Sequence, residues 1–186
     1  MPLFTPIALL TAAALAGQTP EAPDVSAVPA VPVGEQPATS CASDPTLPLT
    51  ELPLTAISSV VEGSRGCVLL FELYASWCGP CVKQAPAIKA LSETYQSQGL
   101  LVRGVSADSD RERLGKFLET HGGVFAPVVL EDWTLEALRA EFAEIGGEFE
   151  DAIPLYLLYD REGKLLYQAS EPKELEALEV AIQGAL

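Results

Sequence analysis

The stretch CVLLFELYASWCGPC, residues 67–81, decides the fold of this chain. Its first eight residues are almost entirely apolar, which is typical of a strand buried on both faces of a sheet. A helix is predicted over residues 78–98, because apolar side chains recur every three or four positions and Gly99 follows. Cys78 and Cys81, at the end of this stretch, therefore lie where a central strand passes into a helix.

That position favours redox chemistry at the cysteines. A cysteine at a helix N-terminus faces unpaired backbone N–H groups and the positive end of the helix dipole, and both favour the thiolate. We predict that Cys78 attacks a disulfide and that Cys81, one turn deeper, resolves the mixed disulfide. Gly79 suits a tight turn and Pro80 a first helical turn. The alternatives are a structural disulfide and half of a zinc site, although zinc normally takes four ligands and the chain has one His and no second CxxC.

Apolar runs and helical periods alternate through the rest of the chain. Further strands are predicted at residues 100–105, 124–130, 155–159 and 164–169, the last two joined by a turn in which Gly163 supplies a positive φ. Three further helices are predicted: one opened by the Ser109 and Glu112 capping box, one capped by Asp132, and one begun by Pro172. The second should turn one apolar stripe inward, made of Leu135, Leu138, Phe142 and Ile145. This order predicts an α/β fold, a mixed sheet with helices on both faces.

The N-terminal part of the chain predicts export. Residues 1–16 carry no charged side chain and end in a small-x-small pattern, which is typical of a signal peptide. Their apolar run of roughly a dozen residues is shorter than the ~20 that span a bilayer, which disfavours a permanent transmembrane anchor. The alternatives to a cleaved signal are an uncleaved anchor and a buried helix. Residues 17–48, rich in Pro and Ala, are interpreted as a disordered tether, and residues 49–186 as the folded domain.

The net charge disfavours two classes of partner, and the two remaining cysteines raise the question of a second disulfide. Acidic residues outnumber basic ones 26 to 11, for a formal charge of -15, which argues against nucleic acid and anionic lipid surfaces as partners. In an oxidising compartment, Cys41 and Cys67 are candidates for a second, structural disulfide. The alternative is that Cys67, at the start of a buried strand, is a free core thiol.

The motifs together resemble a known family. WCGPC after an apolar strand, Pro86 beyond it, and Ile153–Pro154 before the later hairpin resemble the thioredoxin superfamily over about residues 49–186. VRGVSADSDRERLGKFLETHG, FAPVVLED and IPLYLLYDREGKLL are similar to the TlpA/ResA-like branch of extracytoplasmic thiol-disulfide oxidoreductases. The resemblance implies a thioredoxin-like fold, with the active site at the strand-helix junction.

The resemblance also assigns roles to residues around the cysteines. Ile153–Pro154 matches the family's cis-proline step, which presents backbone groups to a substrate strand, and the alternative is an ordinary trans proline. Trp77 would cover the disulfide and, with Gly79 and Pro80, belong to the docking surface.

Glu72 occupies the position at which thioredoxins have a buried acid beneath the active site. Burial in an apolar strand should raise its pKa, so that it exchanges a proton with Cys81. Here the residue is Glu, whereas thioredoxins usually have Asp. The alternative is an acid that pairs with a nearby Lys or faces outward from a sheet edge.

The resulting hypothesis is an exported, periplasmic or otherwise extracytoplasmic enzyme that reduces disulfides. Its substrates would be exported proteins such as apocytochromes or metal-site assembly factors, and a membrane thiol carrier would donate electrons. We expect a monomer that needs neither cofactor nor metal. The alternatives are a non-catalytic binding module of the same fold and a disulfide oxidase or isomerase. A peroxidase is disfavoured, because Ala75 stands where the peroxidatic pattern has Thr or Ser.

Overall fold

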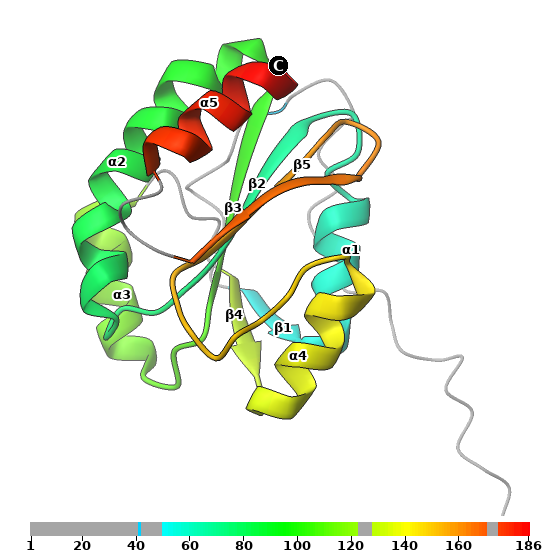
Figure 1. The fold of residues 1–186 in the computed structure, drawn as a ribbon. Helices are drawn as coiled ribbons and strands as arrows, with labels where there is room; N and C mark the ends of the chain where they lie inside the picture. Colours follow the sequence, from blue (N-terminus) through cyan, green and yellow to red (C-terminus); the bar gives the residue numbers. More distant parts are fainter. Residues whose placement is uncertain (1–40, 42–49, 123–127, 171–174) are drawn as a thin grey trace, which may run out of the picture. The chain divides into compact units, whose positions relative to one another are not determined.

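The structure is a computed structural model that describes residue 41 and residues 50–122, 128–170 and 175–186 (Figure 1). These residues belong to one compact unit, Pro32–Leu186, and a second unit, Met1–Val31, lies outside the described residues. The predicted signal peptide, all of the predicted tether except Cys41, and Pro172 at the predicted start of the last helix also lie outside them.

Six strands form one mixed sheet in the order β1-β4-β3-β2-β5-β6. The first four strands in that order run parallel, and β5 and β6 are antiparallel to their neighbours. The mixed sheet predicted from the sequence is thereby confirmed. The strands are β1 (Thr50–Pro53), β2 (Val68–Tyr74), β3 (Leu100–Ser106), β4 (Val128–Glu131), β5 (Leu155–Tyr159) and β6 (Leu165–Ala169).

Helices cover both faces of the sheet (Figure 1). Side chains of α2 (Gly79–Tyr95), α3 (Arg111–His121) and α5 (Leu175–Ala185) join the core on one face. Those of α1 (Ile57–Glu62) and α4 (Leu135–Glu144) join the core on the other face. Short 3-10 turns, Leu54–Ala56 and Gln96–Gln98, precede α1 and follow α2. Within the described residues, no helix combines the length and the apolar character needed to cross a bilayer.

The central strand β2 explains why the opening stretch of sequence is so apolar. All seven of its residues are buried. Side chains alternate between the faces, so that Leu70 and Tyr74 join the core beside α2 while Phe71 and Leu73 join the core beside α1 and α4. A strand covered on both faces is apolar at nearly every position, and Glu72 is the one charged residue of β2.

Two predicted helix starts are wrong. Asp110, rather than Ser109, caps α3, because its carboxylate accepts hydrogen bonds from the backbone N–H groups of Glu112 and Arg113. Thr134, rather than Asp132, caps α4 through a hydrogen bond from the N–H of Ala137.

The α4 correction has a visible cause in the backbone. Asp132 has a φ of 46° and belongs to the turn before the helix, so the helix begins later than predicted. The inward stripe loses Leu135 as a result, since that side chain is 46% exposed, while Leu138 and Phe142 are buried and Ile145 is partly buried as predicted.

The elements at the start of the described domain were not predicted. β1 has four residues and buries only Leu52, and α1 has six residues rich in Ser and Val, which are weak helix formers. Such short segments carry too little periodicity to be recognised. β1 forms by pairing with β4, about 78 positions further along the chain (Thr50↔Val128). Of the predicted strand at 124–130, residues 124–127 lie outside the described residues.

Candidate active site

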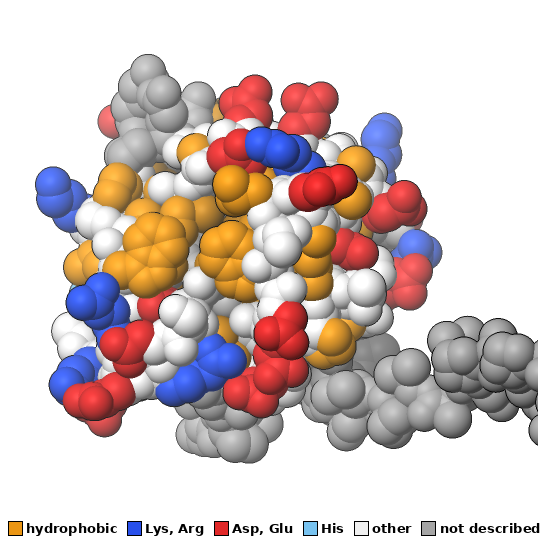
Figure 2. Space-filling view, turned by 90° about the horizontal axis from the view of Figure 1, so that it is seen from below, with side chains coloured by type: hydrophobic (Ala, Val, Ile, Leu, Met, Phe, Trp, Pro, Cys, Tyr) orange, Lys and Arg blue, Asp and Glu red, His pale blue; other side chains and the backbone are white. Residues whose placement is uncertain are grey.

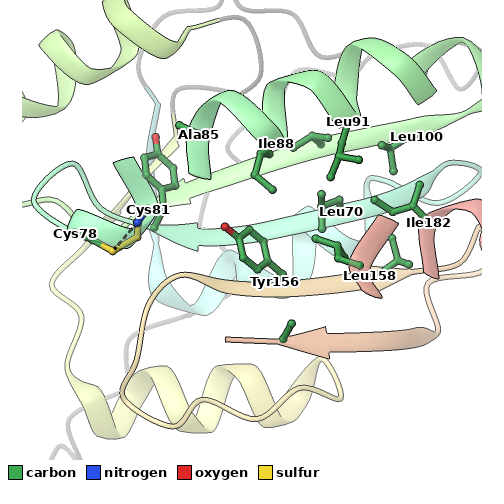
Figure 3. Close-up of a cluster of buried hydrophobic side chains, with 14 of the residues drawn as sticks. Leu70, Cys78, Cys81, Ala85, Ile88, Leu91, Leu100, Tyr156, Leu158 and Ile182 are labelled. Atoms are coloured by element: carbon green, nitrogen blue, oxygen red, sulfur yellow. Dashed lines mark hydrogen bonds between the residues drawn. A yellow bond between two sulfur atoms is a disulfide. The ribbon is translucent and has the colours of Figure 1, made fainter. Parts of the chain in front are cut away.

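The CxxC pair lies at the junction of β2 and α2, as predicted. Cys78 is the N-cap of α2, with extended backbone angles of φ -80° and ψ 108°. Its Sγ accepts a hydrogen bond of 3.2 Å from the backbone N–H of Cys81, and the two sulfurs are joined in a disulfide (Figure 3). An N–H group that points at the sulfur stabilises negative charge on it, so this geometry favours a Cys78 thiolate when the pair is reduced.

The two cysteines differ in their surroundings. Cys78 is 5% exposed and Cys81 is 1% exposed, so only the first offers an edge to solvent. Trp77, Gly79 and Pro80 around it are all exposed, and Trp77 is 52% exposed. Gly79 was expected to permit a tight turn, but its φ is not positive and a Cβ there would meet no atom within 4 Å. The backbone conformation at position 79 therefore does not require glycine. Because glycine has no side chain, the surface beside Cys78 is left uncovered there.

The segment that leads into the β5–β6 hairpin lies next to Cys78. The Ile153–Pro154 peptide bond is cis, and Sγ of Cys78 lies 3.5 Å from the carbonyl oxygen of Ile153. Pro154 is buried, and Ile153 is half-buried against the core. Residues 75 positions apart are thus brought together, with the Ile153 carbonyl beside the Cys78 sulfur.

Glu72 lies on the face of β2 that α2 covers. It is 1% exposed on a central strand, opposite Gly104 of β3 and Tyr156 of β5. Burial raises the pKa of its carboxyl to about 8, against a smaller opposite influence of the Tyr156 hydroxyl. The alternative of a carboxylate paired with Lys or facing outward from an edge is wrong, because no ion pair to Glu72 occurs among the described residues and the strand is central.

A buried hydrogen bond links the strand beside Glu72 to the active-site helix. The hydroxyl of Tyr156 donates to Oε1 of Gln84, which lies on α2 one turn beyond Cys81. Figure 3 places Tyr156 beneath α2, on the side where Cys81 and Ala85 also face inward. Within the described residues, both carboxylate oxygens of Glu72 and Nε2 of Gln84 are buried without a hydrogen-bond partner of ordinary length. An unpaired buried polar group lowers stability, so proteins rarely keep one. Where such groups do occur, they are often part of a functional site.

Asp108 is a positioning residue that sequence reasoning missed. It follows β3, is 1% exposed, and accepts hydrogen bonds from the N–H of Ser76 at 2.7 Å, from the Ser76 hydroxyl, and from the Ser106 hydroxyl at 2.7 Å. It thereby ties the loop before Cys78 to the neighbouring strand. The signal available in the sequence was an Asp just beyond the carboxyl end of a parallel strand, where functional side chains gather.

The other two cysteines lie away from the helix N-terminus. Cys41 and Cys67 are 26 positions apart and are joined in a disulfide, which ties residue 41 to the start of β2. Both are partly buried against the core on the α1 and α4 face. Within the described residues, no three His, Cys, Asp or Glu side chains are grouped so as to hold a metal ion.

Known proteins share parts of this sequence. The profile of the Redoxin family matches residues 21–182. The thioredoxin-like protein CITRX1 of Nicotiana benthamiana, a chloroplastic protein, is 31% identical over 46% of each chain. The thiol-disulfide oxidoreductase ResA of Geobacillus thermodenitrificans is 29% identical over 54% of this chain and 53% of ResA. The chain therefore spans about half the length of the curated relatives it matches.

Solved structures share the fold. A Chlorobium tepidum protein assigned as thiol:disulfide interchange protein DsbE superposes with a TM-score of 0.52 and 28% identity, over 67% of this chain and 84% of that one. The thioredoxin domain of a Bacteroides vulgatus thiol-disulfide oxidoreductase superposes with a TM-score of 0.53 over 67% and 84% of the two chains, and at 18% identity it is informative for the fold alone.

Proposed function

Because the chain belongs to the Redoxin family, we propose that it is a thiol-disulfide oxidoreductase whose reactive groups are Cys78 and Cys81. One observation carries the proposal. At the start of α2, the sulfur of the N-cap residue Cys78 accepts a hydrogen bond from the backbone N–H of Cys81, and Cys78 is the more exposed cysteine of the pair. A nucleophilic cysteine needs such stabilisation of its thiolate together with access to the substrate.

The proposed reaction transfers two electrons to a substrate disulfide. The Cys78 thiolate attacks one substrate sulfur, which forms a mixed disulfide and releases the other substrate sulfur as a thiolate. The Cys81 thiolate then attacks Sγ of Cys78, which releases the second substrate thiolate and leaves the Cys78–Cys81 disulfide. The leaving thiolates take up protons, and a donor dithiol must reduce the enzyme disulfide before the next cycle.

Three groups assist this exchange in our proposal. Glu72 takes the proton from Cys81 as the resolving thiolate forms, since a carboxyl with a pKa of about 8 exchanges protons near neutral pH. Ile153 and Pro154 present backbone groups to the substrate strand, as the 3.5 Å approach of Ile153 to Sγ of Cys78 supports. Trp77, Gly79 and Pro80 form the exposed rim that the substrate contacts.

We further propose that the enzyme works as a reductant outside the cytoplasm. The Gly79–Pro80 dipeptide between the cysteines is shared with thioredoxin, whose reduction potential is about -270 mV. The apolar run of residues 1–16 and its small-x-small end support export, and the Cys41–Cys67 disulfide suits an oxidising compartment. Substrates would be disulfides of exported proteins, such as apocytochromes or metal-site assembly factors, and electrons would come from a membrane thiol carrier.

An insulin-reduction assay tests the chemistry. We expect the wild-type chain to turn over with dithiothreitol as donor and Cys78→Ser to lose turnover, because no thiolate remains to attack. Equal turnover of the two proteins would overturn the catalytic role and leave a binding module. A reduction potential above about -150 mV would instead indicate an oxidase or isomerase.

Export and substrates need an experiment in cells. Cys81→Ser should accumulate mixed disulfides at Cys78, which identify the substrates after affinity capture and mass spectrometry. N-terminal sequencing of the mature protein from separated cell fractions tests the signal peptide. A mature chain in the cytoplasm that retains residues 1–16 would contradict export.

A further inference from the structure

A cavity of about 610 Å³ opens beside the active site. It lies between the loop that carries Trp77, the turn from β3 into α3, and the turn from β4 into α4. Its walls include Trp77, Asp108, Arg111, Glu131, Asp132 and Trp133. Trp77 directly precedes Cys78, so the cavity shares a wall residue with the exposed rim of the proposed active site. Figure 2 views the molecule from this end and shows hydrophobic side chains near the middle of the face, with acidic and basic side chains around them.

The apolar walls are aromatic. Trp77 is 52% exposed, and Trp133 is half-buried against the core beside α4. An exposed indole offers a large apolar face, which attracts both aliphatic chains and cations. These two are the chain's only tryptophans. The walls therefore suit a long aliphatic side chain that ends in a positive charge.

The charges around the cavity are unbalanced. Arg111 is the basic residue of the lining, and Glu51 pairs with it at 3.3 Å. Among the described residues, Glu131 and Asp132 form no ion pair. A hydrogen bond with Glu51, repulsion from Glu51 and Asp132, and partial desolvation raise the pKa of Glu131, and the positive charge of Arg111 offsets only part of this. Crowded carboxylates of this kind gain from an added cation.

We propose that this cavity is a specificity subsite that receives a Lys or Arg side chain next to the target cysteine of the substrate. The aliphatic stem lies between Trp77 and Trp133, and the charged end meets Glu131 and Asp132. The proposal rests on the proposed function, because it selects among disulfide substrates of the same site. The preferred substrate class is thus a disulfide in a basic segment.

The first experiment measures binding of a peptide to the cavity in the absence of disulfide exchange. Because both tryptophans line the cavity, their fluorescence reports on its occupation. The wild-type chain is titrated with a cysteine-free acetylated pentapeptide amide whose central residue is Lys, norleucine or Glu. We expect the Lys peptide to bind about fivefold to tenfold more tightly than the norleucine peptide, and the preference to shrink at high salt. Equal binding of the Lys and norleucine peptides overturns the proposal.

Reduction rates test the same preference in turnover. Disulfide-bridged peptides that differ only in Lys, norleucine or Glu beside the bridged cysteine are compared within each protein. The paired variant Glu131→Gln/Asp132→Asn should lose most of the Lys preference, and Asn is suitable at 132 because it tolerates the positive φ. The matched control, Glu119→Gln/Glu176→Gln, removes two exposed acids from α3 and α5 and should keep the preference.

The outcomes separate this proposal from the proposed function. Cys78-dependent reduction of all three peptides at equal rates overturns the subsite and leaves the oxidoreductase assignment intact. No reduction of any peptide overturns the oxidoreductase assignment, while the fluorescence titration still decides the subsite. An equal loss of Lys preference in both paired variants assigns the effect to net charge and overturns the subsite.

Discussion

Glu72 is a carboxyl that is 1% exposed and that forms no ion pair within the part of the chain that the structure describes. The strand around it is buried on both faces, and its oxygens have no hydrogen-bond partner of ordinary length within the described residues. The same burial that disfavours the carboxylate brings the pKa of Glu72 close to neutral pH, which suits the proton transfer proposed for it. Stability and proposed function are therefore in opposition at this residue.

This opposition predicts a pH dependence of stability. The Glu72 pKa is about 8 in the folded protein and about 4.3 in the unfolded chain, so between these values the folded state binds more protons. Stability should fall as pH rises from about 4.5 to about 8, by on the order of 4 kcal/mol from this group. Glu72→Gln should remove that dependence in urea unfolding measured across this pH range.

The exposed Glu119→Gln serves as the control for Glu72→Gln, and its stability should follow the wild-type pH dependence. Parallel curves for wild type and Glu72→Gln would mean that Glu72 is ionised in the folded protein throughout this range.

At the scale of the elements, contacts from β3 and β5 hold the start of α2 in place. Asp108 beyond β3 holds Ser76, and the hydrogen bond from Tyr156 of β5 to Gln84 holds the second turn of the helix. The N-cap sulfur at Cys78 thus has fixed neighbours on both sides of β2. Precise placement matters here, because thiol exchange requires aligned sulfurs.

Replacing Asp108 tests this support. In Asp108→Asn the side chain loses its charge and presents an amide to donors, so the Ser76 N–H and hydroxyl lose at least one good acceptor. We expect a loss of about 2 kcal/mol of unfolding free energy and faster hydrogen exchange of the Ser76 amide. The matched control is Asp110→Asn, an exposed helix cap two positions along, which should be nearly neutral because Asn caps as well as Asp. Similar losses in both variants would argue against a special role for Asp108.

For the molecule as a whole, the Cys41–Cys67 disulfide joins a residue outside the sheet to its central strand. In the chain-entropy model such a bridge stabilises by restricting the unfolded state, and it leaves the active-site geometry alone. We therefore expect the two disulfides to have separate roles, Cys41–Cys67 in stability and Cys78–Cys81 in the proposed thiol exchange.

The double variant Cys41→Ser/Cys67→Ser should lose about 3 kcal/mol of unfolding free energy in chemical denaturation. Its insulin reduction at 25 °C should match wild type, since neither residue belongs to the proposed site. A large loss of turnover in a variant that is still folded by circular dichroism would show that the bridge shapes the active site.

Local sequence determined the elements that carry their own signal. The apolar run before Cys78, the period of α2, the stop at Gly99 and the hairpin glycine at 163 each depend on neighbouring residues, and the structure agrees with all of them. The thioredoxin-like fold was predicted because WCGPC and Ile153–Pro154 are distinctive short motifs. Their chemistry depends on residue type and spacing, which a sequence displays directly.

Tertiary structure decided what depends on distant partners. Both Ser109 and Asp110 are able to cap a helix, and in the structure Asp110 does so, two positions after Asp108, which is bonded to Ser76 32 positions away. Leu135 is apolar yet exposed, because the turn at Asp132 delays α4. The environment of Glu72 and the cavity beside Trp77 arise only when separate strands and turns meet. Contacts of this range leave no periodic trace in the sequence, since each partner alone is compatible with several surroundings.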